Sequence, residues 1–235
     1  MSGSPAPDPL KQHERLIDHF KRVYSIVAGL ALTEACRRSL PIESIFDFRL
    51  WMFATLFITL VPIFHGGDRS LDQKHCGRPP QTVWERVAFV WDDYMLLLTA
   101  VLFVCIAESI PSAADIGTPS DFAPGRFYFW MSVTFGFDVF VLGVDYVKNW
   151  QRRSELRPYW VWIVANSLLC YICLRASQLV LLDYSVKTVS VALLGDVTLF
   201  TLSVVVFICA LLRTIVDYSV GDAFLFPRTN TGQTI

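Results

Sequence analysis

Charged side chains lie within apolar segments of this sequence, where contact with lipid would be costly. Asp138 is midway along the apolar stretch 127–148, and Asp145 follows seven residues later, on the same face of a helix. Charges inside a membrane usually face a bundle interior, and they form internal ion pairs or line ion and proton paths. These acids are therefore candidates for handling a cation or a proton.

Acids and two arginines form a predicted network of embedded charges. Its members are Asp92, Asp93, Glu108, Asp138, Asp145, Arg175 and Arg213. Their depths predict an inner cluster around Arg213 and an outer cluster around Arg175. The expected partners are Asp92, Asp93 or Asp145 for Arg213, and Glu34, Glu108 or Asp138 for Arg175. One interpretation is that these pairs only neutralise one another and fix the register of the helices. The other is that surplus acids line a path for cations or protons.

The stretch 22–39 carries a second pattern. Ser25, Gly29 and Thr33 recur at four-residue spacing, and Glu34 follows directly after them. Small residues at this spacing let helices approach closely. The stripe predicts a packing surface within the chain, an interface between subunits, or the wall of a narrow pore. In a pore, a ring of Glu34 side chains would attract cations.

Motifs of enzymes and cofactor sites are absent from the sequence. It has no HExxH motif, no serine nucleophile elbow and no phosphate-binding glycine loop. Cys170 and Cys173 have CxxC spacing but lie inside an apolar segment, where cysteine packs as a small hydrophobic residue. Residues 64–76 contain His, Asp and Cys without tight ligand spacing, and Gly66-Gly67 predicts the end of a helix. We predict no enzyme, no cofactor and no bound metal.

The composition indicates a membrane protein. Of 235 residues, 54% are hydrophobic and 17% are charged, whereas soluble domains have about 25% charged residues. The alternative is an unusually apolar, all-helical soluble domain. With a net charge of −1, the chain has no electrostatic signature of nucleic-acid binding. We predict the lipid bilayer as its main environment.

Six apolar segments are predicted to cross the membrane. They lie at about 22–39, 49–65, 86–108, 127–148, 159–182 and 192–218. Only the run 50–67 reaches 18 residues without Asp, Glu, Lys or Arg, so the other crossings require their charges to pair or to extend toward the headgroups. The separators are polar with Gly or Pro stops, and all seven Trp fall at or near segment ends, as in an aromatic belt.

The predicted fold is all-α: a polytopic membrane protein with a compact bundle of six transmembrane helices. Residues 10–22 predict an amphipathic helix at the membrane interface, and residues 10–226 a single domain. Residues 1–9 and 227–235 are Pro-, Ser- or Thr-rich and predicted to be disordered. Lys and Arg concentrate before the first segment and after the second and fourth, which places both termini in the cytoplasm.

Two functions fit these features. The first is an oligomeric channel or permeation protein for a cation or proton, because a thin bundle of short helices leaves little room for a sealed interior cavity. A homo-oligomer around the first helix is then expected. The second is a non-conducting scaffold or sensor that anchors a cytoplasmic protein partner through its basic loops.

Overall fold

The computed structural model describes residues 8–42, 44–112, 124–148, 157–182, 188–191 and 195–220. Within these residues the fold is helical, as predicted, with one small hairpin. The helices are α1 (Pro9–Ser39), α2 (Phe48–His75), α3 (Val83–Glu108), α4 (Pro124–Lys148), α5 (Arg157–Leu182) and α6 (Leu199–Val220). Apart from Asp8 and Pro9, the segments predicted to be disordered, 1–9 and 227–235, lie outside the described residues.

Local capping explains where three of the helices begin. The Asp8 carboxylate accepts a hydrogen bond from the backbone N–H of Leu10, and Asp47 accepts one from Arg49. At the start of α3, Thr82 and Glu85 form a reciprocal capping box, in which each side chain accepts a bond from the other's backbone N–H. Such caps satisfy N–H groups that have no partner within the helix.

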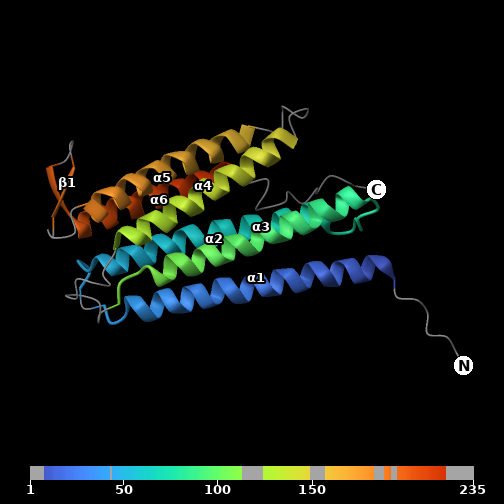
Figure 1. Cartoon of the computed structure of the whole chain (residues 1–235), viewed down its shortest axis with the longest axis horizontal. Helices are drawn as coiled ribbons and strands as arrows, with labels where there is room; N and C mark the ends of the chain where they lie inside the picture. Colours follow the sequence, from blue (N-terminus) through green and yellow to red (C-terminus); the bar gives the residue numbers. More distant parts are fainter. Residues whose placement is uncertain are drawn as a thin grey trace, which may run out of the picture.

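The helices pack side by side along the long axis of the molecule (Figure 1). Figure 1 shows one group of α1, α2 and α3 beside a second group of α4, α5 and α6, although α2 contacts α6 more extensively than it contacts α1 or α3. The two groups meet where α2 contacts α6 and where α3 contacts α4. The later part of α2, the early part of α3, the second half of α4, the start of α5 and the end of α6 contribute to the lining of one cavity.

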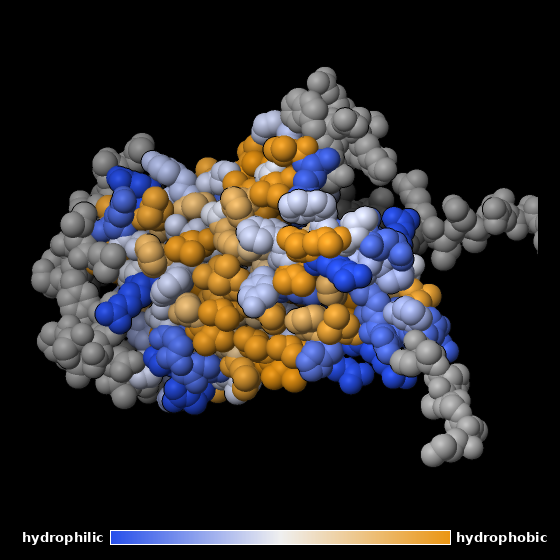
Figure 2. All heavy atoms as spheres, turned by 45° about the vertical axis from the view of Figure 1, so that its right-hand side comes forward, coloured by the Kyte–Doolittle hydropathy of each residue, from blue (hydrophilic) through white to orange (hydrophobic). Residues whose placement is uncertain are grey.

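Five helices, α2 to α6, are long and apolar enough to cross a membrane. Apolar side chains dominate the middle of the face seen in Figure 2, and hydrophilic ones gather toward its two ends. Such a band is expected of a surface that contacts lipid between two layers of headgroups. The chain therefore has the helices of a multi-pass membrane protein.

Helix α1 differs from the two elements predicted for its residues. The predicted interfacial helix 10–22 and the predicted first span 22–39 form one continuous helix of 31 residues. Its apolar part is interrupted by charges, so α1 is not among the five helices that meet the criteria for a span. It packs lengthwise against α3 and α2 (Figure 1), through a face that includes Ile17, Tyr24 and Ala31.

The prediction that Gly66-Gly67 ends the second helix was wrong. Helix α2 continues to His75, about two turns beyond the glycines. Glycine has a low helix propensity, but close packing against α3 explains why it is found here. A Cβ on Gly67 would lie only 2.5 Å from the Leu96 side chain. Gly67 therefore allows α2 and α3 to approach closely. The added turns carry Asp72, Lys74 and His75.

The predicted sixth span began too early. Residues 188–191 (β1) and 195–198 (β2) form an antiparallel pair, in whose backbone register Val189 is paired with Val197. Helix α6 therefore begins at Leu199 rather than near residue 192. The run "TVSV" consists of β-branched residues and one small serine, a composition that favours a strand over a helix.

Candidate functional site

A cavity of about 450 Å³ lies between the two groups of helices. Tyr24 of α1 reaches its wall, and the rest of the lining comes from α2 to α6. Thr99 and Leu142 illustrate the mixture of polar and apolar groups in this wall. Its charged lining residues are Lys74, Asp92, Asp138, Asp145, Arg213 and Asp217. Four carboxylates and two cationic side chains thus line one partly open cavity between the helices, which the sequence analysis did not predict.

The first group of charges is the Arg213 cluster, consisting of Asp138, Asn166, Arg213 and Asp217. Arg213 forms ion pairs with Asp138 (Nη2 to Oδ2, 3.5 Å) and Asp217 (Nη1 to Oδ2, 3.0 Å). Its Nε donates to the Asn166 side-chain oxygen at 2.9 Å, and Asn166 donates to Asp138 at 2.5 Å. Asn166 is completely buried, so α4, α5 and α6 are joined by polar contacts inside an apolar bundle.

The second group is the Lys74 cluster, consisting of Lys74, His75, Asp92 and Asp145. The Lys74 ammonium lies 2.9 Å from Asp145 and 3.6 Å from Asp92. His75 Nε2 lies 3.0 Å from the same Asp92 carboxylate. These contacts join α2, α3 and α4, and they depend on the turns of α2 that follow Gly67.

The prediction that Arg213 pairs with Asp92, Asp93 or Asp145 was wrong. Within the described residues, Arg213 pairs with Asp138 and Asp217. Lys74 is the ion-pair partner of Asp92 and Asp145, because the extended α2 carries its ammonium group to both acids.

Asp93 stands apart from both clusters. Its side chain is buried, and neither carboxylate oxygen has a hydrogen-bond partner among the described residues. Phe89 and Leu96 lie on the same face of α3, one turn before and one turn after it. Both belong to an apolar cluster that also contains Ile17 of α1. Asp93 is therefore a carboxyl group at an apolar contact between helices.

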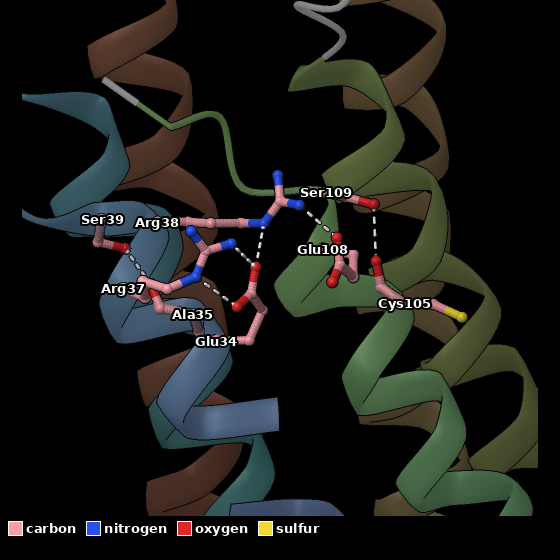
Figure 3. Close-up of polar contacts among 8 residues, drawn as sticks. All are labelled: Glu34, Ala35, Arg37, Arg38, Ser39, Cys105, Glu108 and Ser109. Carbon is pink, nitrogen blue, oxygen red and sulfur yellow. Dashed lines mark hydrogen bonds and ion pairs between the residues drawn. The ribbon is translucent and has the colours of Figure 1, made fainter. Parts of the chain in front are cut away.

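The opposite end of the bundle carries a separate charge cluster. Arg38 of α1 lies between Glu34 and Glu108 and makes an ion pair with each, which ties α1 to α3 (Figure 3). Arg37 also binds Glu34, at 2.5 Å. Among the described residues, Arg175 makes no ion pair and donates instead to Gln178. The predicted partnership of Arg175 with Glu34, Glu108 or Asp138 was wrong, because Arg38 takes both glutamates and Arg213 takes Asp138.

The small-residue stripe of α1 faces away from the rest of the chain. Ser25, Gly29 and Thr33 are exposed, and no other group lies within 4 Å of a Cβ built on Gly29. The hydroxyls of Ser25 and Thr33 each donate to the carbonyl four residues earlier. The stripe is therefore not a packing surface for any part of the chain that the structure describes, and the interface and pore interpretations stay predictions.

The sequence analysis missed several residues of the cavity wall. Lys74 was assigned to a loop, because the paired glycines masked the continuation of α2. Asp217 has a recognisable signal, since it follows Arg213 by four residues and shares its helix face. The only mark of Asn166 in the sequence is that it is the single Asn of the 17-residue charge-free run that begins at Pro158. Nothing in the sequence marks Tyr24 as a residue of the cavity wall.

Comparisons with known proteins give no relative. The chain matches no family model, no curated protein and no solved structure. Within the described residues, no group of three or more His, Cys, Asp or Glu could hold a metal ion.

Proposed function

We propose that the chain is a permeation protein for a cation or proton and that the cavity, rather than α1, handles the ion. The observation that carries this proposal is the set of four carboxylates around one interior space. Placing acids inside an apolar bundle is costly, and such residues commonly mark ion or proton pathways. The cationic Lys74 and Arg213 reduce this cost and keep the carboxylates in place.

Homo-oligomerisation is a second part of the proposal. The open stripe of Ser25, Gly29 and Thr33 has the spacing that lets helices from two subunits approach closely. Ile26 and Leu30 beside it are more than 60% exposed and would add apolar contact area. In this arrangement α1 joins subunits, and each subunit has its own cavity.

Flux into liposomes tests which acids handle the ion. Purified protein is reconstituted, and proton and potassium flux are compared for wild type, Asp138→Asn and Glu34→Gln. The proposal predicts that Asp138→Asn lowers the flux at least about tenfold, as expected for loss of a charged contact. Glu34→Gln should retain flux, because Glu34 belongs to the cluster at the other end. The reverse pattern would assign the path to α1.

A non-conducting scaffold is the alternative function. One observation favours it: Lys74, Arg213 and Arg38 each contact two carboxylates, so every one of these six acids has a cationic partner within the chain. Near-zero flux in wild type and both variants, with folded protein throughout, would support the scaffold. The sequence predicts that its cytoplasmic partner would bind the basic loops.

A further inference from the structure

The Arg213 cluster contains more negative than positive charge. Arg213 is its single cation and is shared by Asp138 and Asp217. Both contacts of Asp138, from Arg213 and Asn166, go to Oδ2. Oδ1 therefore has no hydrogen bond or ion pair within the described residues, although Asp138 lines the cavity and its side chain is 24% exposed. A carboxylate oxygen is available there to a cationic group.

Tyr24 supplies an independent observation on the same cavity. Its side chain is completely buried, it belongs to the cavity wall, and its hydroxyl has no hydrogen-bond partner among the described residues. Buried hydroxyls are nearly always hydrogen-bonded, because an unsatisfied one is costly. The hydroxyl is thus a second unpaired polar group beside the cavity, and a small shift of the Tyr24 ring would bring it into contact with an occupant.

The rest of the wall suits the body of an organic molecule. Phe137, Val141, Leu142 and Trp162 line the same cavity, and aromatic faces attract ammonium groups. The volume of about 450 Å³ falls within the range of small-molecule sites, roughly 300–1,000 Å³. A bare metal cation requires several oxygen ligands close together, and the described residues contain no group of three or more acids, His or Cys placed to hold one.

We infer that the cavity binds a small organic molecule with one protonated amine. The ammonium group donates to Asp138 Oδ1 and to the Tyr24 hydroxyl oxygen, and the apolar body lies against Phe137 and Trp162. One added positive charge balances the excess negative charge of the Arg213 cluster. This inference rests on the proposed function, because it names the class of cation that the same cavity takes.

The test uses the full chain in lipid nanodiscs and calorimetric titration with 2-phenylethylamine. The matched neutral probe is 2-phenylethanol, which has the same ring and chain without the charge. We expect the amine to bind at least about tenfold more tightly than the alcohol, because it forms charge-assisted hydrogen bonds. Equal binding of the two probes, or no binding of the amine above empty nanodiscs, would overturn the inference and leave water as the occupant.

Three variants locate the bound amine. Asp138→Asn should weaken amine binding at least about tenfold, and Tyr24→Phe a few fold. Asp138→Asn leaves Arg213 paired with Asp217, so the fold should persist, and thermal unfolding without ligand checks this. The control is Asp68→Asn, which removes an acid outside the cavity while its partner Lys21 retains Asp72. If Asp138→Asn unfolds, Tyr24→Phe decides, and unchanged binding in that variant refutes the site.

Flux measured without amine separates this inference from the proposed function. Proton or potassium flux in a protein that does not bind 2-phenylethylamine would refute amine binding in the cavity and leave the permeation function standing. Binding of the amine at Asp138 by a protein without flux would refute the permeation function alone.

Discussion

Asn166 shows how one neutral side chain can hold a charged site together. Its oxygen accepts from Arg213, and its amide donates to Asp138, so both ions keep a partner inside the bundle. Neither aspartate nor leucine could do both, because an ionised carboxylate only accepts and leucine has no polar group. The residue type is therefore dictated by the two charges beside it.

Replacement of Asn166 by Ala should destabilise the protein. The change leaves a buried guanidinium N–H and a carboxylate oxygen with fewer partners, at a cost of roughly 1–2 kcal/mol. Thermal or denaturant unfolding in detergent measures the difference. The matched control is Ser167→Ala, because Ser167 is the exposed neighbour on the same helix and should change stability little. Equal stability of the two variants would contradict the bridging role.

Asp93 should respond to mutation in the opposite direction. Asp93→Leu replaces a buried carboxyl group that has no described hydrogen bond by an apolar group of similar size, and should raise the unfolding temperature. Asp92→Leu is the contrasting variant, because it removes the acid that Lys74 and His75 share, and it should lower stability by about 1–3 kcal/mol. A lower stability of Asp93→Leu than of wild type would show that Asp93 has a favourable contact.

At the scale of elements, the path of α2 depends on two glycines with different surroundings. A Cβ added at Gly66 would have nothing within 4 Å of it, whereas the Gly67 position is closed by Leu96. An alanine at either position favours the helix by roughly 0.5–1 kcal/mol. Only at Gly67 does the new methyl group collide with a side chain of the core.

The paired alanine variants should therefore differ in stability. Gly66→Ala is expected to stabilise the protein by up to about 1 kcal/mol, because it adds helix propensity without a collision. Gly67→Ala should lose this gain, since the Leu96 side chain must move from its place in the apolar cluster that α3 forms with α1 and α2. Parallel thermal unfolding of both variants tests the order, and a Gly67→Ala protein as stable as Gly66→Ala would contradict the close approach of α2 and α3.

Helix α1 has two faces with small residues, and they should behave differently. Ala31 is fully buried against the bundle, so Ala31→Leu is expected to overpack the core and destabilise the subunit by roughly 1–3 kcal/mol. Gly29 faces open space, so Gly29→Leu should leave subunit stability nearly unchanged and weaken the proposed subunit interface. Unfolding temperature and light-scattering mass measure the two effects, and an unchanged mass in Gly29→Leu would count against this interface.

Sequence reasoning identified the long apolar elements but not all of their boundaries. Apolar composition and embedded charges are local signals, which is why α3 to α5 and the residues Asp92, Asp138 and Arg213 could be recognised. Continuation of α2 through Gly66-Gly67 depends on contacts with α3, which a local propensity does not contain. The cavity could not be predicted either, because Tyr24 and Lys74 reach it only through packing of the two groups of helices.

At the scale of the whole molecule, the predicted orientation places Cys36 outside and Cys76 in the cytoplasm. Both cysteines are exposed, and they lie near opposite ends of the bundle, at the end of α1 and after α2. A membrane-impermeant maleimide applied to intact cells should therefore label wild type and Cys76→Ser but not Cys36→Ser. After permeabilisation, Cys36→Ser should gain label at Cys76. Labelling of Cys36→Ser in intact cells would reverse the orientation and place the cavity end of the bundle on the outer side.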